Sequence, residues 1–482
     1  MVKTIGNVQQ DAQVRAVASG TLSNGDTIIV NSDGTVSAVA SSGSPQSVTS
    51  LTKIANNQEY PSAVYDSNAQ KIVYFYRDGL NAGRGAAVVG TVSASSISFG
   101  TPTLFTASGA TANWISAAFD EDNNKVIVSY ARDYGPIEGW AVVGTISGTS
   151  ISFGSEARFE TGLPLYTSTT YDTTNNKVVI AYKDQSNSNY GTAVVGTVSG
   201  TSISFGTPAV FSSSEANYQN INFDSSAGKV GIIYNGWNGS SYEGFGVVGT
   251  VSGTSISYGT PVGISSSAYW VIAGYDASAG SFSAVYRDTT PKTYVIAGQI
   301  SGTSFSFGSA VEIGTGTMNA RGGFAYDANA QKSVFNYPQG TSPYVLSVKI
   351  SGTTVTIDTP TELSSSISYR GGGNVYVPSV QKVVLFVNDT NDSESGNYYI
   401  FTTDSLTTNL TSDNFIGFAD GAYADTQSAV INTTCSVDRS QTSLTAGQKY
   451  YVQTDGSLGT TAADPSVEAG TAISSTEILV KG

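Results

Sequence analysis

A unit of about 52 residues recurs along most of this 482-residue chain and constrains its fold more than any other feature. Its marker is an aromatic-Asp pair, usually followed by Lys five positions after the Asp, as in YDSNAQK at Tyr65-Asp66. Successive marker Asp residues are 54, 52, 52, 52 and 51 positions apart. They are Asp66, Asp120, Asp172, Asp224, Asp276 and Asp327, and a degraded seventh copy has Val377 instead. A fixed period of this length indicates a propeller or a solenoid.

Each copy contains four short segments that are rich in β-branched and aromatic residues and are separated by Gly, Ser, Asn and Asp. This pattern predicts four antiparallel strands in meander order. Four-stranded units arranged around an axis form a β-propeller, whereas open stacking gives a β-solenoid. The length and the strand number favour the propeller. We therefore predict an all-β fold, with a seven-bladed β-propeller of four-stranded antiparallel blades at residues 46–406.

The two ends of the chain are predicted to meet. The seventh copy has no evident fourth strand, and SVTSLTKIANN, from Ser47, resembles the fourth strand that precedes other copies, so an N-terminal strand should close the ring. Residues 22–34 align without gaps to residues 444–456. We therefore expect a small C-terminal β module at residues 407–482, with residues 1–45 as an N-terminal β arm packing with it. Cys435 should be a buried structural thiol of this module.

The composition excludes several classes of site. The chain has no histidine and one cysteine, which excludes a Ser-His-Asp triad, a His-ligated metal site and an internal disulfide. A net charge of −14 argues against a nucleic-acid partner. No apolar run is long enough for membrane insertion, and the first twenty residues lack the apolar region of a signal peptide. We expect no cofactor and no bound metal.

One position of the repeat, six residues before the marker Asp, is the candidate binding site. It falls where the chain enters the innermost strand, so its side chains should surround the mouth of the central channel. Aromatic and Arg side chains pack against sugar rings and partner side chains alike. The alternative is that they plug the channel or wedge adjacent blades apart. The candidate residues are Tyr60, Trp114, Tyr166, Tyr218, Trp270 and Arg321, with Gly371 in the seventh copy.

The loops between the second and third strands should open on the same face, and they differ in every copy. Their Tyr, Ser, Gly and Asn content is also found in antibody paratopes, so recognition and neutral drift are both open interpretations. A glycosidase would need two carboxylates facing a cleft. Carboxylates follow the second strand in four copies, each beside Arg or Lys, and such pairs are usually exposed loop-end charges. These are Asp78, Asp133, Asp184 and Asp288. No catalytic residue is predicted.

Three C-terminal stretches, NFIGFADGAYADTQSAVI, LTAGQKYYVQTDGSLGTT and PSVEAGTAISSTEILVKG, resemble tail and structural proteins of marine and cyanobacterial bacteriophages. The segments VVGTVSGTSISFGTP and LSNGDTIIVNSDGTVS resemble the same group, so the resemblance covers most of the chain. It implies a virion component, either a tail fibre or appendage or a head-decoration protein. It carries no catalytic residues to this chain.

The expected function is accordingly that of a non-enzymatic virion surface protein. It should bind a host-surface glycan or receptor, or another virion protein, through the loop face. We expect a homo-oligomer that is assembled in the host cytoplasm and released by lysis. An architectural decoration protein without a host ligand and a propeller-type glycan hydrolase are the two alternatives.

Overall fold

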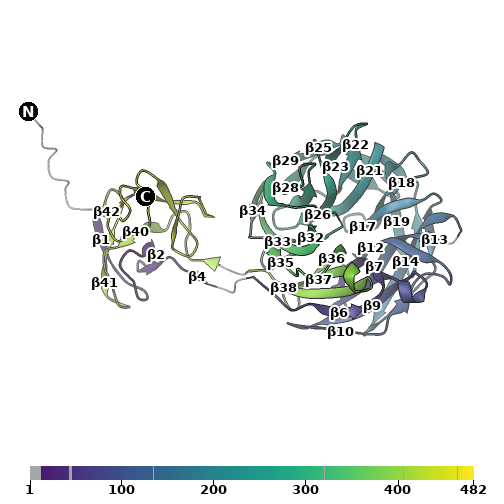
Figure 1. The fold of residues 1–482 in the computed structure, drawn as a ribbon, viewed down its shortest axis with the longest axis horizontal. Helices are drawn as coiled ribbons and strands as arrows, with labels where there is room; N and C mark the ends of the chain where they lie inside the picture. The colour runs from purple at the N-terminus through teal and green to yellow at the C-terminus, as the bar shows by residue number, and fades with distance from the viewer. Residues whose placement is uncertain are drawn as a thin grey trace, which may run out of the picture. The chain divides into compact units, whose positions relative to one another are not determined.

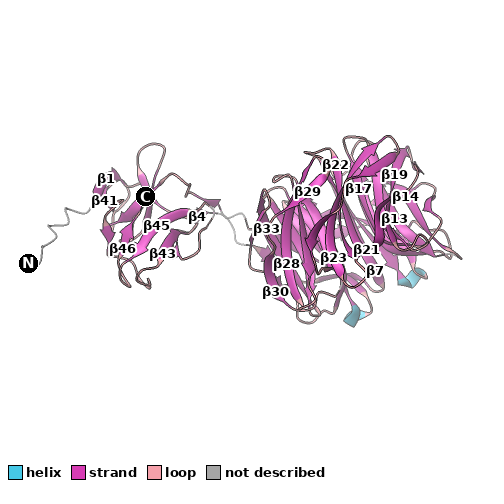
Figure 2. Ribbon diagram, turned by 90° about the horizontal axis from the view of Figure 1, so that it is seen from above, coloured by secondary structure: helices cyan, strands magenta, loops and turns pink. Residues whose placement is uncertain are grey.

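The computed structural model describes residues 12–42, 46–133, 135–319, 321–404, 407–463 and 465–481. The N-terminal arm predicted for residues 1–45 lies partly outside these described residues. The chain divides into a larger unit, residues 46–403, and a smaller unit, residues 1–45 and 404–482. Both are built from antiparallel strands, with short 3₁₀ turns at Gly79–Asn81 and Thr390–Asp392 (Figure 2), so the all-β prediction is confirmed. No described helix is long and apolar enough to cross a membrane.

The first complete repeat shows how the larger unit is built (Figure 1). Strands β7 (Gln58–Asp66), β8 (Lys71–Asp78), β9 (Arg84–Val92) and β10 (Ile97–Phe99) form an antiparallel sheet in the order β10-β9-β8-β7. A short β11 (Thr103–Leu104) also pairs with β9. β-branched and aromatic residues dominate β8, which is almost wholly buried and has sheets on both faces. The predicted meander of four strands is therefore present in this repeat.

The other repeats have the same strand order, and their first strands line a central axis (Figure 1). The first strands are β12 (Thr111–Asp120), β17 (Pro164–Asp172), β21 (Ala209–Asp224), β26 (Tyr269–Asp276), β31 (Gly323–Asp327) and β36 (Tyr369–Val377). The second strands are β13 (Lys125–Asp133), β18 (Lys177–Asp184), β22 (Lys229–Trp237), β27 (Ser281–Arg287), β32 (Lys332–Gln339) and β37 (Lys382–Asp389). The third strands are β14 (Ile137–Ser147), β19 (Tyr190–Ser199), β23 (Tyr242–Ser252), β28 (Lys292–Ser301), β33 (Ser342–Ser351) and β38 (Ser395–Thr402).

The outermost strands are short and come in two pieces. They are β15 (Ser150–Phe153) with β16 (Ala157–Glu160), β20 (Ser202–Phe205) with the start of β21, β24 (Ser255–Tyr258) with β25 (Val262–Ser265), β29 (Ser304–Phe307) with β30 (Val311–Thr315), and β34 (Thr354–Ile357) with β35 (Thr361–Glu362). Beside β38 the outer position is taken by β5 (Ser47–Val48) and β6 (Thr52–Ala55), which come from the other end of the chain.

Hydrophobic clusters between adjacent sheets stabilise the larger unit. One cluster combines Val73 and Phe75 of β8 with Val128 and Tyr130 of β13. Another joins the first and last repeats, because residues from β8 and β9 share it with Val384 and Phe386 of β37 and Ile400 of β38. The core is thus distributed between neighbours around the axis, as expected when each repeat buries its faces against the next.

The aromatic-Asp marker has a structural role. The carboxylate of Asp276 is fully buried and accepts hydrogen bonds from the backbone N–H groups of Ser278 and Ala279, both at 3.0 Å. Asp66 accepts from two backbone N–H groups of its own turn in the same way. The marker therefore caps the tight turn between the first and second strands, the role that Asp commonly plays in turns.

The smaller unit contains two five-stranded sheets of similar layout. The first has the order β1 (Gln13–Val17), β41 (Ser428–Asn432), β40 (Phe415–Ala419), β2 (Thr27–Val30) and β3 (Val36–Ala38). The second has the order β42 (Val437–Asp438), β46 (Ile478–Val480), β45 (Val467–Ala472), β43 (Lys449–Val452) and β44 (Leu458–Gly459). A two-stranded pair, β4 (Ser41–Ser42) with β39 (Thr407–Thr408), stands where the chain leaves this unit and returns to it.

The two sheets match residue by residue. Ile28 pairs with Gly417 in the first and Tyr450 with Gly470 in the second, and both glycines have a positive φ, 146° and 151°. Gly25 donates to the Ala419 carbonyl, and Gly447 donates to the Ala472 carbonyl. The similarity noted between residues 22–34 and 444–456 therefore extends to the whole sheet. The larger unit is inserted in the first copy, between β3 and β40.

Cys435 corrects one prediction about this unit. Its thiol is exposed, not buried. The residue lies in the turn between β41 and β42 with φ at 70°, and its backbone N–H donates to the Val480 carbonyl at 3.0 Å. A turn with a left-handed backbone directs the side chain away from the sheet, so residue type alone was a poor guide to its burial.

Candidate functional site

Five of the predicted site residues occupy the same irregular place in their strands. The pairing of β7 with β8 shifts register between Glu59 and Ser62, and β12, β17, β21 and β26 shift at the corresponding point. Within each shift one aromatic residue has a left-handed backbone. The φ angles are 53° for Tyr60, 54° for Trp114, 55° for Tyr166, 50° for Tyr218 and 54° for Trp270. A β-bulge re-aims the side chain it carries, and here it turns each ring toward the axis.

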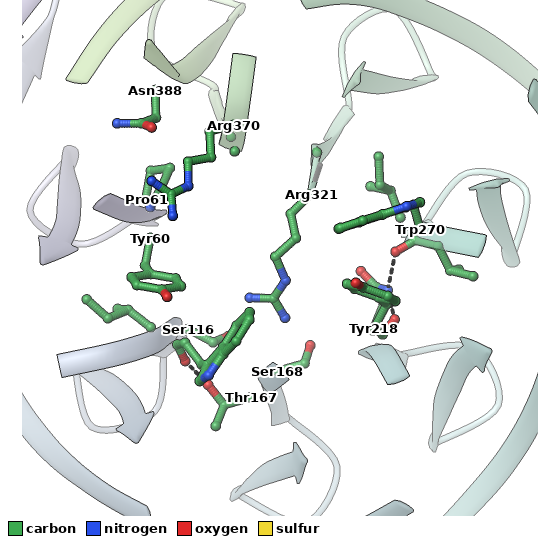
Figure 3. Close-up of a pocket in the computed structure, with 18 of the residues that line it drawn as sticks. Tyr60, Pro61, Ser116, Thr167, Ser168, Tyr218, Trp270, Arg321, Arg370 and Asn388 are labelled. Carbon is green, nitrogen blue, oxygen red and sulfur yellow. Dashed lines mark hydrogen bonds between the residues drawn. The ribbon is translucent and has the colours of Figure 1, made fainter. Parts of the chain in front are cut away.

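The five rings contact one another in a continuous arc around the axis, and Figure 3 shows three of them, Tyr60, Tyr218 and Trp270. The ring centroids are 5.2 Å apart for Tyr60 and Trp114, and 4.5 Å apart for each later neighbouring pair up to Trp270. All five side chains are partly buried. Burial raises the pKa of the Tyr218 hydroxyl above its usual value. The arc is thus an aromatic wall with one side open to a cavity.

Arg321, the sixth predicted residue, completes the arc in a different way. It precedes β31, outside any strand, and its side chain extends into the space enclosed by the rings (Figure 3). The guanidinium carbon lies 4.9 Å from the centroid of the Trp114 ring and 5.4 Å from that of the Tyr166 ring. Burial lowers the pKa of this guanidinium below its usual value. Arg321 is therefore held by cation–π contact with rings of other repeats.

A cavity of about 360 Å³ opens at this mouth, within the range of about 300–1,000 Å³ common for ligand sites. Five of the six predicted residues line it. The sixth, Tyr166, does not line the cavity, but its ring contacts the rings of two residues that do. Gly371 also lines the cavity and leaves a gap in the arc at the seventh position. The structure therefore brings the predicted residues together at one mouth.

Sequence reasoning missed two polar residues of this cavity, Arg370 and Asn388. Arg370 is exposed and forms an ion pair with Glu394. The Asn388 amide donates to the Gln58 carbonyl at 2.5 Å, which joins the last repeat to the first. Both residues belong to the degraded seventh copy, whose first strand lacks the aromatic residue, so the repeat offered no signal for them.

Small polar side chains line the channel below the rings. Ser116 accepts a hydrogen bond from the Thr169 backbone at 3.0 Å, and Ser168 accepts one from the Ile221 backbone at 3.1 Å. These bonds link the first strands of adjacent repeats. A second cavity of about 190 Å³ shares Ser168 and Asn220 with the first and extends the opening along the axis. The site is therefore aromatic at its rim and polar within.

The carboxylates near the mouth already form ion pairs or hydrogen bonds within the protein. Glu59 lines the cavity and lies 3.6 Å from the Arg77 guanidinium. Asp78, Asp184 and Asp288 accept backbone hydrogen bonds from the loops that follow them, so they cap those loops. Within the described ranges no group of three His, Cys, Asp or Glu side chains is placed to hold a metal ion.

The sequence matches no protein-family model and no curated protein. Solved structures are similar in fold. A lectin from Burkholderia pseudomallei is 10% identical with a TM-score of 0.54, and the match covers 74% of this chain and 99% of the lectin. An intramolecular trans-sialidase from Ruminococcus gnavus is 9% identical with a TM-score of 0.45, over 73% of this chain and 97% of that one. A β-propeller domain from Myceliophteria thermophila is 8% identical with a TM-score of 0.46, over 74% and 99%.

The lectin, the one of these three with a TM-score above 0.5, shares the propeller-like fold of the larger unit. The solved structures also correct one prediction: the chain was expected to be non-enzymatic, and that is contradicted by the sialidases that stand among the neighbours of its fold. Since identity is near 10%, no binding or catalytic residue is transferred from them to this chain.

Proposed function

We propose that the larger unit is a seven-bladed β-propeller whose ring is closed by residues 47–55. The pairing of β5 and β6 with β38 supports this, as does the hydrophobic cluster shared by the first and last repeats. Closure removes the free edge of β38. Residues 56–404 expressed alone should aggregate or unfold at a lower temperature than residues 46–404, and a peptide of residues 46–56 added in trans should restore the stability. Unchanged stability of the truncated chain would contradict closure.

We propose further that the channel mouth binds a saccharide. One observation carries this: five partly exposed aromatic residues are held in a left-handed backbone conformation around an open cavity. Such strain persists where surrounding structure imposes it and is concentrated at ligand sites. Aromatic faces present rigid apolar area to a sugar ring, while Ser116, Ser168 and Asn220 offer hydrogen bonds to hydroxyl groups.

Binding to a panel of soluble polysaccharides and to the host cell surface tests this function. Trp114→Ala and Trp270→Ala should each weaken binding at least tenfold. Trp237→Ala is the matched control, because Trp237 is an exposed tryptophan outside the cavity and its loss should leave binding unchanged. Equal weakening by all three variants, or no binding by the wild type, would overturn the proposal.

The place of such a protein in a virion remains our proposal, supported by the resemblance of segments such as VVGTVSGTSISFGTP to phage structural proteins. Antibody labelling of purified particles in the electron microscope tests it. Labelled particles together with saccharide binding would support an adhesin. Labelled particles without saccharide binding would support an architectural protein, and unlabelled particles would refute a virion location.

Glycan hydrolysis is the second candidate function. The Glu59 carboxylate and the Tyr60 hydroxyl lie side by side in sequence and line the same cavity, and some glycosidases use a tyrosine nucleophile. Release of reducing ends from bound oligosaccharides would support hydrolysis if Glu59→Gln abolished it. Glu312→Gln, at an exposed ion pair with Lys292, is the control that should retain full activity.

A further inference from the structure

Arg321 is the one cation of the channel mouth without a counter-charge among the described residues. The two other arginines around the mouth have acidic partners: Arg77 lies 3.6 Å from Glu59, and Arg370 pairs with Glu394. The Arg321 guanidinium instead lies over the Trp114 and Tyr166 rings. At this position of the repeat, five copies have an aromatic residue and the seventh has glycine. The sixth copy has Arg321, which carries a permanent positive charge.

The surroundings of Arg321 favour an anion from outside the chain. Its side chain is partly buried, so it has lost part of its hydration without gaining an ion pair. Its head points into the open cavity of about 360 Å³ (Figure 3). A guanidinium in such a setting forms short, bidentate hydrogen bonds to a carboxylate or a sulfate, and these are among the strongest available to a protein. The rings that flank it present flat apolar faces at the same place.

We propose that the saccharide bound at this mouth carries an anionic group, a carboxylate or a sulfate ester, and that the Arg321 guanidinium is its receptor. This inference rests on the proposed saccharide-binding function and narrows it to acidic saccharides. The aromatic arc would hold the sugar ring by stacking, while Arg321 would fix its orientation through the charged substituent. The net charge of −14 would repel acidic polymers elsewhere on the protein, so binding should depend strongly on this one residue.

The test uses pairs of polysaccharides that differ only in charge. Polygalacturonate is compared with its methyl ester, and carrageenan with its desulfated form, by calorimetry on the full chain. We expect at least tenfold tighter binding of the charged member of at least one pair, and weaker binding as salt is raised. The pair that responds distinguishes a carboxylate from a sulfate ligand.

Three variants test the role of Arg321 itself. Arg321→Met keeps most of the side-chain volume and should abolish the preference for the charged member while retaining binding of the neutral one. Arg321→Lys keeps the charge without the planar fork and should retain part of the preference, which also provides a folded variant if the Met variant is unstable. Arg158→Met removes an exposed arginine that pairs with Glu138 and should change nothing.

The outcomes separate the two proposals. If no member of any pair binds, saccharide binding itself fails. If neutral and charged members bind equally well, saccharide binding stands and the acidic specificity is overturned. If the charged member is preferred but Arg321→Met and Arg321→Lys both retain the full preference, Arg321 is not the receptor, and its role is to fill the channel.

Discussion

At the scale of single residues, the channel mouth is made by side chains whose own backbone preference opposes their position. A left-handed conformation costs an L-residue about 1–2 kcal/mol, and Gly or Asn normally takes it. Here Tyr60, Trp114, Tyr166, Tyr218 and Trp270 take it in successive repeats. The bulge in each first strand imposes the conformation, and as a result each ring points toward the axis. Function and stability are therefore expected to conflict at these positions.

The backbone strain at Trp114 can be measured with two substitutions that both remove the ring. Trp114→Gly should be more stable than Trp114→Ala by about 1 kcal/mol, because glycine has no side chain to oppose a φ of 54°. Urea unfolding gives both values. At Ser116, two positions along the same strand and outside the positive-φ residues, the order should reverse. The same order at both sites would contradict the strain.

A buried tyrosine should make stability fall in alkali. Burial raises the pKa of Tyr234 from 10.0 to about 12, although a hydrogen bond with Ser212 acts in the opposite direction. The unfolded chain therefore loses this proton first, so the contribution of Tyr234 is complete below about pH 10 and is lost as pH rises to about 12. Between about pH 10 and pH 12, the free energy of unfolding of Tyr234→Phe should fall by up to about 3 kcal/mol less than that of the wild type, as measured by denaturant unfolding. Identical slopes would contradict this.

At the scale of elements, the repeated unit is specified by its turns as much as by its strands. The marker carboxylate caps the first turn through two backbone N–H groups, and the Asp276 carboxylate also accepts from the Ser278 hydroxyl at 2.8 Å. The carboxylate is buried at the start of the turn, so losing it would leave these turn donors without their acceptor. A short polar turn thus sets the register of two almost wholly buried strands.

Removing one of these caps should be costly. Asp276→Ala should destabilise the chain by about 1–3 kcal/mol, because it removes the buried acceptor of two partly buried backbone hydrogen bonds. Asp276→Asn retains an acceptor oxygen and should cost about half as much. Asp133→Ala, at an exposed loop end, is the control and should change stability by less than about 0.5 kcal/mol. Thermal or urea unfolding measures all three, and equal effects at both sites would refute the capping role.

At the scale of the whole molecule, the larger unit is an insertion in a duplicated small β unit. The two halves of the small unit share strand order, pairing and positive-φ glycines. The chain leaves the first half after β4 and returns at β39, and Ser42 is paired with Thr407 at that point. Paired strand ends lie about 5 Å apart, which a two-residue hairpin turn can span. The larger unit can therefore be inserted without a change in the spacing of the paired strands of the small unit.

Excision of the larger unit should leave a folded protein. In the variant, Asn-Gly replaces residues 43–406 and joins Ser42 to Thr407 as a hairpin. It should be monodisperse and show strand-type circular dichroism with a cooperative thermal transition. Residues 46–404 expressed alone should also fold and retain saccharide binding. An unfolded small unit would show that its halves depend on the insertion, in contradiction to the duplication described above.

Much of this molecule follows from the sequence alone. The 52-residue period, the alternation of strand and turn residues and the aromatic-Asp marker of six copies predicted the all-β repeats. The same period aligned the six residues of the channel mouth, because equivalent positions in a repeat occupy equivalent places around an axis. Local chemistry, repeated at fixed spacing, was sufficient for these features.

Only the tertiary structure decided the rest. The bulges and left-handed rings depend on how the first and second strands of each repeat pair, and the ion pair of Arg370 depends on the folding of the seventh repeat. Only the position of the Arg321 guanidinium over the rings of other repeats depends on contacts between distant repeats. No local sequence pattern encodes these contacts. Cys435 is exposed because of its turn geometry, not its residue type. The sequence showed the duplication only in residues 22–34 and 444–456, and strand pairing extends it to β40 with β41 and β45 with β46. Residue type sets which strands and turns form, and long-range packing sets where their side chains meet.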